Sequence, residues 1–373
     1  MKKIILFVGI VACIFTACKD KNAYTLTGTF ASNELDGKTV YLRQLDSLFR
    51  KSDAVDSTNV VNGQFVFKGI AEETPVVRVV TMDEPYLSAA FVAEKGNIVM
   101  SVDSTSASIV KGTAMNDQYG QFEISQIDII KRINSNYSNF LDIKNAGDVT
   151  PEQIQEYEKS SNQLWEEMVN IVSNFVKPII ATPIGQYAFV DNMYELKDNQ
   201  LKEIISSAPS DFQNINRIQN LMERIEKREA TAVGKQFTDV KGFNLDGKEV
   251  SLSDYAGKGK VVLIDFWASW CGPCRQAMPD VVKIYQKYKN KGFEIVGISL
   301  DAKKEDWKQA VNDLNITWPQ ISNLKGWEED CAVAYGVDLI PQTVLIDKDG
   351  KIVERNIGDE ALDLKLQELL GSK

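Results

Sequence analysis

The sequence predicts a multidomain protein in which a small all-β, sandwich-like region and a helical segment precede a C-terminal α/β domain. Three observations carry this prediction. Apolar and polar residues alternate in short runs up to about Val110, apolar residues then recur at helical spacing, and strand-like runs alternate with helical ones from about Thr231 onward. A length of 373 residues is also too great for one ordinary domain.

The N-terminus has the pattern of an exported protein. Two lysines precede the apolar run of residues 4–15, which is short for a bilayer span and typical of a secretory signal. The small residues before Cys18 resemble the lipobox of bacterial lipoproteins, although Phe15 stands where leucine is usual. This resemblance implies removal of residues 1–17, lipidation of Cys18 and a periplasm-facing anchor in the bacterial cell envelope, and Lys19 favours the outer membrane. The alternative is an ordinary secretory signal.

Residues 18–112 are predicted to form the β-rich accessory domain. Tyr24, Leu26 and Phe30 alternate with threonines, and Asn62-Gly63 is typical of a tight turn. Short alternating strands separated by turn residues indicate a small antiparallel sandwich or barrel. Nothing in this region indicates catalysis.

Residues 113–230 are predicted to be helical. One expected helix face contains Tyr119, Phe122, Ile127, Ile130, Ile133 and Tyr137. Thr150-Pro151 followed by Gln153 is typical of an N-cap, a first-turn proline and a capping box, and Pro178 should end that helix. The second helix carries an apolar stripe that favours packing within a helical hairpin, with a dimerising coiled coil as the alternative; it consists of Ile154, Tyr157, Leu164, Met168, Ile171 and Phe175.

Residues 231–373 are predicted to form the α/β domain. Residues 260–267 are almost continuously apolar, as expected of a central strand that is covered on both faces. The other expected elements are a hairpin at 243–250, a helix at 274–288, a strand at 293–299, helices at 305–314 and 328–335, a hairpin at 343–355 and a helix at 359–370.

Composition excludes several kinds of function. The chain has no histidine, so a Ser–His or Cys–His catalytic pair is impossible and the commonest metal ligand is absent. A net charge of −10 argues against nucleic-acid binding. Five cysteines are too few for a disulfide scaffold of this size, so each must be explained individually.

Cys271-Gly272-Pro273-Cys274 stands where the buried strand meets a helix. Two cysteines at this spacing and place indicate a redox pair, because a zinc site needs two further ligands and only Cys331 remains to supply one. The N–H groups and dipole of the helix N-terminus favour a thiolate at Cys271. We expect Cys271 to be exposed, and Cys274 to be shielded beneath it and to attack a mixed disulfide from within.

Residues 261–274 resemble thioredoxin, and the pattern around them resembles the thioredoxin-like thiol–disulfide oxidoreductases of bacterial envelopes (TlpA/ResA-like, with an AhpC/TSA-related fold). The stretch from Gly112 to Tyr119 resembles the accessory domain often fused to such proteins. The resemblance implies a thioredoxin fold, with Cys271 as nucleophile and Cys274 as resolving thiol. It also implies substrate contacts from Trp270, Ile340 and Pro341, with Pro341 preceded by a cis bond.

Asp265 matches the carboxylate that the thioredoxin family buries under its second cysteine, and its apolar neighbours favour burial. With no imidazole available, it is the expected acceptor of the proton that Cys274 loses. Cys331 is expected to be a small buried core residue. Trp307, Trp318 and Trp327 are expected to serve packing.

The expected activity is therefore thiol–disulfide exchange, most simply the reduction of protein disulfides, with no cofactor and no metal. A thiol reductant in the membrane or envelope would supply the electrons. One alternative is a peroxiredoxin-like peroxidase, although Ile264 and Ala268 stand where such enzymes carry proline and threonine. Others are a dimeric disulfide isomerase, and a binding module regulated by its redox site.

Overall fold

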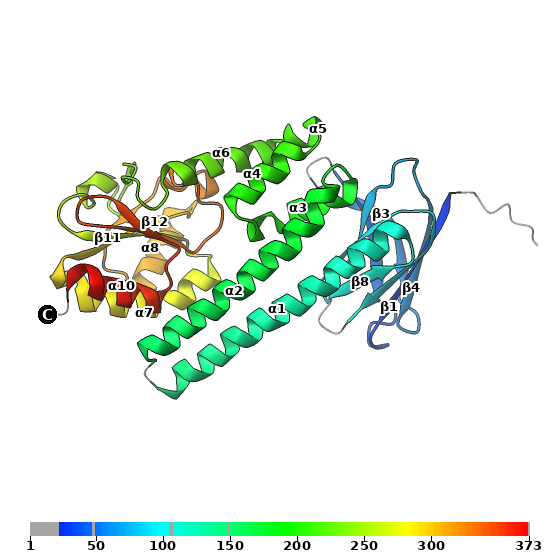
Figure 1. The fold of residues 1–373 in the computed structure, drawn as a ribbon, viewed down its shortest axis with the longest axis horizontal. Coiled ribbons are helices and arrows are strands. Elements are labelled where there is room, and N and C mark those ends of the chain that lie inside the picture. The colour runs from blue at the N-terminus through cyan, green and yellow to red at the C-terminus, as the bar shows by residue number, and fades with distance from the viewer. Residues whose placement is uncertain (1–21, 47–48, 104–106, 148, 372–373) are drawn as a thin grey trace, which may run out of the picture. The chain divides into compact units, whose positions relative to one another are not determined.

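The computed structural model describes residues 22–46, 49–103, 107–147 and 149–371. The predicted order of an all-β region, a helical segment and an α/β domain is confirmed (Figure 1). The described residues divide into two compact units, one within 22–132 and 167–196 and the other within 133–166 and 197–371.

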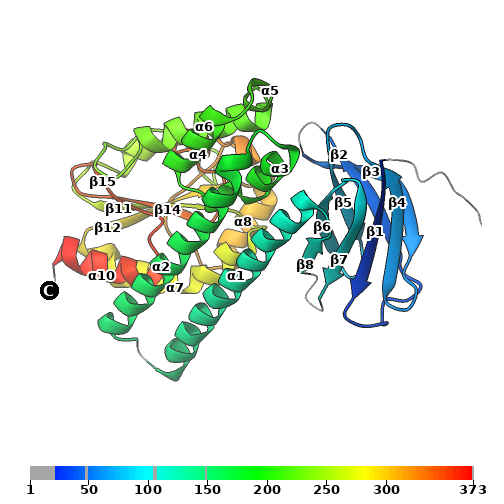
Figure 2. The same cartoon turned by 45° about the vertical axis from the view of Figure 1, so that its right-hand side comes forward.

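The first unit contains two four-stranded sheets, visible on the right of Figure 2. One has the strand order β4-β1-β7-β8, and β1 pairs antiparallel with β4 and parallel with β7. The other has the order β3-β2-β5-β6 and is antiparallel throughout. The strands are β1 (Ala23–Phe30), β2 (Thr39–Leu45), β3 (Lys51–Asn59), β4 (Gln64–Ile70), β5 (Val77–Met82), β6 (Leu87–Val92), β7 (Gly96–Val102) and β8 (Ser108–Lys111).

Period-two alternation gives these sheets their core. Tyr24, Leu26 and Phe30 are buried, since every second side chain of a strand points to the same face. The Tyr24 ring on β1 lies 6.0 Å from the Phe91 ring on β6, between centroids, which joins the two sheets. The expected turn at Asn62-Gly63 is present, with φ of 53° and 70°.

Two long helices follow, α1 (Ala114–Ala146) and α2 (Pro151–Val176). In the first unit, the buried Asn116 side chain bonds both the N–H and the carbonyl of Val92 at 2.8 Å, which fixes the start of α1 on β6. The Phe122 and Phe175 rings stack at 4.2 Å between centroids. Helix α2 ends before Pro178, as predicted, and Pro178 itself lies in a short 3-10 turn.

The ends of α1 and α2 that belong to the second unit also pack against each other. Phe140 stacks on Tyr157 with 4.0 Å between ring centroids, so packing within a helical hairpin is confirmed. Thr150 and Gln153 form the predicted capping box. The predicted apolar face is wrong in part: Ile130 and Tyr137 are exposed. Periodicity marks a helix face but does not say how much of it a neighbour covers.

Four shorter helices complete the helical segment: α3 (Pro183–Asn192) in the first unit, and α4 (Asp198–Ser207), α5 (Ser210–Gln213) and α6 (Asn216–Ala230) in the second. Arg228 on α6 contacts Asp198 on α4 at 2.7 Å and Asp338 of the α/β domain at 2.8 Å. These bonds tie α4 and α6 to that domain. No helix within the described ranges is long and apolar enough to cross a membrane.

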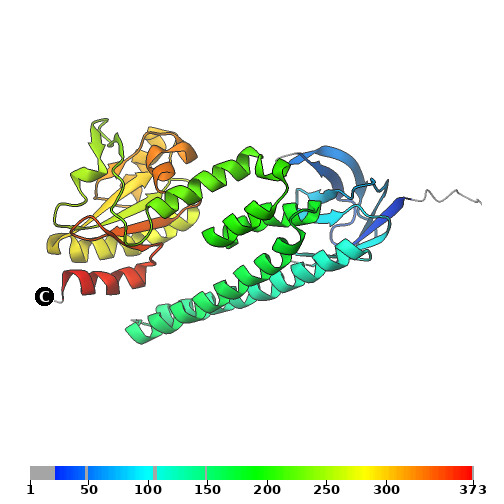
Figure 3. The ribbon, with the colours of Figure 1, turned by 45° about the horizontal axis from the view of Figure 1, so that its top comes forward.

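The α/β domain has a five-stranded mixed sheet in the order β13-β12-β11-β14-β15, beside a small β9–β10 hairpin. All seven residues of the central strand β11 are buried, as predicted. Helices α7 and α10 run side by side on one face of the sheet (Figure 3). The elements are β9 (Lys241–Phe243), β10 (Glu249–Ser251), β11 (Val261–Trp267), α7 (Gly272–Tyr288), β12 (Phe293–Ser299), α8 (Lys304–Asp313), β13 (Gln320–Ile321), α9 (Asp330–Ala334), β14 (Gln342–Ile346), β15 (Ile352–Arg355) and α10 (Asp359–Leu370).

Candidate active site

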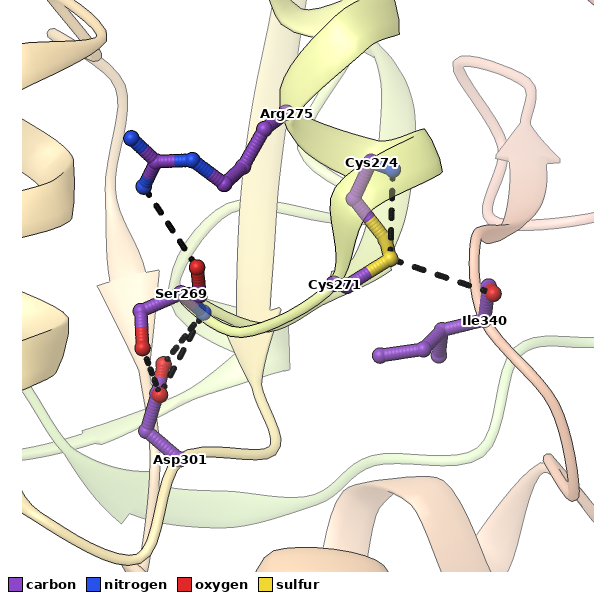
Figure 4. The surroundings of a disulfide bond; sticks show 6 residues. All are labelled: Ser269, Cys271, Cys274, Arg275, Asp301 and Ile340. Carbon is purple, nitrogen blue, oxygen red and sulfur yellow. Dashed lines mark hydrogen bonds between the residues drawn. A yellow bond between two sulfur atoms is a disulfide. The ribbon is translucent and has the colours of Figure 1, made fainter. Parts of the chain in front are cut away.

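Cys271 and Cys274 lie at the junction of β11 and α7, joined by a disulfide bond (Figure 4). Cys271 is the N-cap residue of α7, which therefore begins two residues before the predicted start at Cys274. The backbone N–H of Cys274 donates to Cys271 Sγ at 3.1 Å. The first turn of the helix thus directs a hydrogen-bond donor, together with its positive dipole end, at the sulfur of Cys271.

The expectation that Cys271 is exposed is wrong. Cys271 is 4% exposed and Cys274 3%, so burial does not distinguish the two sulfurs. The cause is tertiary: both residues belong to the core of the domain, and the carbonyl oxygen of Ile340, from a distant loop, lies 3.9 Å from Cys271 Sγ. What distinguishes Cys271 is the N–H donor that faces its sulfur.

The Ile340–Pro341 peptide bond is cis, as the resemblance implies. It precedes β14, which pairs antiparallel with β11 and so brings this loop beside the cysteines. Figure 4 shows Ile340 facing the Cys271 sulfur. The local sequence around the cysteines, or around Pro341, does not by itself indicate that these two segments lie side by side.

Trp270, which precedes Cys271 in the chain, forms an exposed aromatic pair with the distant Trp327. Trp270 is 54% exposed and its ring lies 5.8 Å from that of Trp327, between centroids. Trp327 was expected to serve packing, yet its side chain is also exposed. Trp307 and Trp318 are buried, as predicted.

Asp265 lies in the middle of β11, opposite Thr343 of β14, and is only 6% exposed, which confirms its predicted burial. Its Oδ2 atom has no hydrogen-bond partner among the described residues. Burial, and to a smaller extent the nearby Asp359 carboxylate, raises the pKa of this carboxyl to about 7. The group can therefore exchange a proton near neutral pH.

Asp265 and Cys274 line the same cavity, whose volume is about 490 Å³. Pro273 and Pro341 form part of its wall, and Asp359 at the start of α10 lies on it as well. Burial raises the pKa of Asp359 to about 6. Sequence reasoning missed Asp359, because nothing in the pattern of α10 places it near the cysteines.

A buried aspartate fixes the loop before Cys271. Asp301 is 1% exposed and accepts hydrogen bonds from the Ser269 hydroxyl at 2.5 Å, the Ser269 N–H at 3.1 Å and the Ser299 hydroxyl at 2.8 Å. Figure 4 shows the hydrogen bonds between Ser269 and the Asp301 carboxylate. In the sequence, the one indication of a role for Asp301 is its position at the end of a predicted strand.

Cys331 is a free thiol in α9 and fully buried, as predicted, and burial raises its pKa. No group of three or more cysteine, aspartate and glutamate side chains in the described part of the chain is arranged to hold a metal ion.

A buried strand leading into a helix with Cys-Gly-Pro-Cys at its start, opposite a cis-proline loop, defines a thioredoxin-fold thiol–disulfide oxidoreductase. Residues 232–369 match the Redoxin family, and residues 24–119 match a domain of unknown function, DUF4369. The thiol–disulfide oxidoreductase ResA of Bacillus anthracis is 38% identical over 133 residues, which cover 36% of this chain and 74% of that protein. ResA of Oceanobacillus iheyensis is 32% identical over 177 residues, covering 48% and 76%.

This chain belongs to the ResA-like family of thiol–disulfide oxidoreductases. Among solved structures, it is similar to the thioredoxin domain of a thiol–disulfide oxidoreductase from Bacteroides vulgatus. The two are 35% identical, with 38% of this chain and 99% of that one covered and a TM-score of 0.35.

The burial of Asp265 predicts a pH-dependent stability. Ionising a carboxyl whose pKa is raised from 3.8 to about 7 costs the folded state about 4 kcal/mol at high pH, at about 1.4 kcal/mol for each pKa unit. Wild-type stability should therefore fall as pH rises from about 4 to 7 and then level off. Asp265→Asn should be more stable than wild type by about 2–4 kcal/mol at pH 8, and by less than about 1 kcal/mol at pH 4.

Urea unfolding of the oxidised protein across this pH range measures the difference. Asp349→Asn, at an exposed turn position, is the matched control and should bring no such gain. A difference between Asp265→Asn and wild type that does not change with pH would contradict the prediction.

Proposed function

We propose that this protein reduces disulfides of client proteins in the bacterial cell envelope through Cys271 and Cys274. The observation that carries the proposal is the N–H of Cys274 directed at Cys271 Sγ at the start of α7, beside the Pro341 loop. The Cys271 thiolate attacks one sulfur of the client disulfide, forms a mixed disulfide and releases one client thiolate.

Cys274 then loses its proton and attacks Cys271 Sγ. This step releases the second client thiolate and leaves the enzyme disulfide, so the client gains two electrons and the enzyme loses two. A membrane or envelope thiol reductant returns the pair to the dithiol. Exposed Trp270, with Ile340 and Pro341, supplies contacts for an extended client segment on this face.

The two alternative enzyme activities, peroxidase and isomerase, differ from disulfide reduction in the reaction that they catalyse. A peroxidase of the peroxiredoxin kind would consume peroxide, and Ile264 and Ala268 stand where its proline and threonine belong. An isomerase would have to reshuffle disulfides without net reduction, as a dimer. Rates of peroxide consumption, net disulfide reduction and reactivation of scrambled ribonuclease separate the three activities.

Cys274→Ser should accumulate mixed disulfides with clients, because it keeps the nucleophile and removes the resolving thiol. The adducts are measured by non-reducing electrophoresis and mass mapping, and should all pass through Cys271. Cys271→Ser is the matched control and should trap little. Adducts that form chiefly through Cys274 in that control would reverse the two assignments.

Asp265 is proposed as the base that accepts the Cys274 proton. It lines the same cavity as Cys274, its Oδ2 has no hydrogen-bond partner among the described residues, and its pKa of about 7 suits proton transfer near neutral pH. Attack by Cys271 depends less on this carboxylate, because the helix terminus favours that thiolate.

Asp265→Asn should slow decay of the mixed disulfide roughly 10- to 100-fold near pH 7. In wild type, decay should accelerate as pH rises towards 7, as the base loses its proton, and then level off. Stopped-flow reduction of a protein disulfide, with formation and decay of the mixed species followed separately, measures both steps. Unchanged decay in a folded variant would make Asp265 structural and assign the proton to water or a lysine.

The envelope location rests on the signal-like residues 1–17 and on Cys18, which lie outside the described residues. We propose that Cys18 carries the lipid anchor. Wild type should then fractionate with membranes, outer ones in particular, and Cys18→Ala should not. A Cys18→Ala protein that stays membrane-bound with an acylated mass would contradict the anchor.

A further inference from the structure

The wall of the cavity beside Cys274 is built partly by a segment outside the α/β domain. Tyr137 and Phe140 from the end of α1 and Tyr157 from the start of α2 line it, opposite Pro273, Cys274 and Pro341. Phe140 is stacked on Tyr157, so this wall is a fixed aromatic surface. A volume of about 490 Å³ is within the usual range for a ligand pocket.

Ion pairs hold this wall in place. Lys144, near the end of α1, contacts Asp280 on α7 at 2.8 Å and Glu360 on α10 at 2.9 Å. The hydrogen bond to Asp280 is the main cause of the raised pKa of Lys144. The pairs are partly exposed and contribute modest stability, but they join the helix hairpin to both helices beside the redox pair.

The cavity has an excess of negative charge. Its lining contains the carboxyl groups of Asp265, Asp280, Asp359 and Glu360, and one basic side chain, Lys144, which the ion pairs to Asp280 and Glu360 already engage. Asp265 Oδ2 is buried on this wall without a hydrogen-bond partner among the described residues. A basic group in the cavity would relieve the repulsion between Asp265 and Asp359 and could bond the unpartnered oxygen.

We propose that this cavity binds the client segment next to the disulfide being reduced, and that it selects extended segments with a lysine or arginine beside the reacting cysteine. The aromatic wall of Tyr137, Phe140 and Tyr157 packs against the aliphatic stem of that side chain, and its charged end meets Asp265 and Asp359. This inference rests on the proposed function and adds the class of client.

The test uses three disulfide-bonded peptides that differ only in a Lys, Gln or Glu beside one cysteine, with hydroxyethyl disulfide as a small neutral reference. Rates of reduction by the reduced wild-type chain should fall in the order Lys, Gln, Glu. We expect a Lys-to-Glu ratio of at least about tenfold at low salt, shrinking at high salt.

One variant tests the carboxyl groups of the cavity, and another tests its aromatic wall. Asp359→Asn should reduce the Lys-to-Glu ratio severalfold. Tyr137→Ala should lower the rate with the Lys peptide relative to the rate with hydroxyethyl disulfide. Tyr137 is 52% exposed, so its truncation should leave the fold intact. The matched control is Trp165→Ala, on α2, whose 46% exposed ring does not line the cavity. Its rates should equal those of wild type.

The outcomes separate this inference from the proposed function. Equal wild-type rates with all three peptides, or a Tyr137→Ala variant with wild-type relative rates, would overturn the client pocket and leave disulfide reduction standing. A wild-type protein that reduces none of the disulfides would overturn the proposed function itself.

Discussion

The central strand β11 buries a carboxyl group among apolar side chains, and one of its oxygens, Asp265 Oδ2, has no hydrogen-bond partner within the described ranges. Asp265 has apolar neighbours on its strand, and its side chain is buried where it lines the cavity beside Cys274. Its ionisation costs folding free energy, which the surrounding apolar core has to offset. The same cost keeps the pKa of the carboxyl near neutral pH, which is what the proposed transfer of the Cys274 proton requires.

The two cysteines differ in the hydrogen-bond donor that faces each sulfur and not in their exposure. Both sulfurs are buried, but the first turn of α7 turns a backbone N–H towards Cys271, while Cys274 faces the cavity that also contains Asp265. In the proposed mechanism, the N-terminus of the helix favours the attacking thiolate of Cys271, and the buried carboxyl accepts the proton of the resolving thiol. Asp301 fixes the loop before Cys271, and the Ile340 carbonyl lies against the Cys271 sulfur. Both contacts help to position the redox pair.

The helical hairpin supplies part of the wall of the cavity beside the redox pair. Its aromatic end, joined to α7 and α10 through Lys144, lines one side of that cavity. A segment whose sequence shows only amphipathic helices therefore lines a cavity in a domain that lies far along the chain. Pattern matching confined to the C-terminal residues would leave this contribution out.

The sequence by itself determined the elements of secondary structure and the nature of the redox chemistry. Local signals carried both: period-two alternation for the strands, the capping box at Thr150, continuous apolarity for β11, and Cys271 and Cys274 at its end. Tertiary structure alone decided that Cys271 is buried, that Asp359 faces Asp265, that Trp327 meets Trp270 and that Tyr137 and Tyr157 line the cavity. The physical reason is distance along the chain. Periodicity and capping act within a few residues, whereas the burial of a sulfur and the pKa of a carboxyl depend on whichever distant segments pack against them.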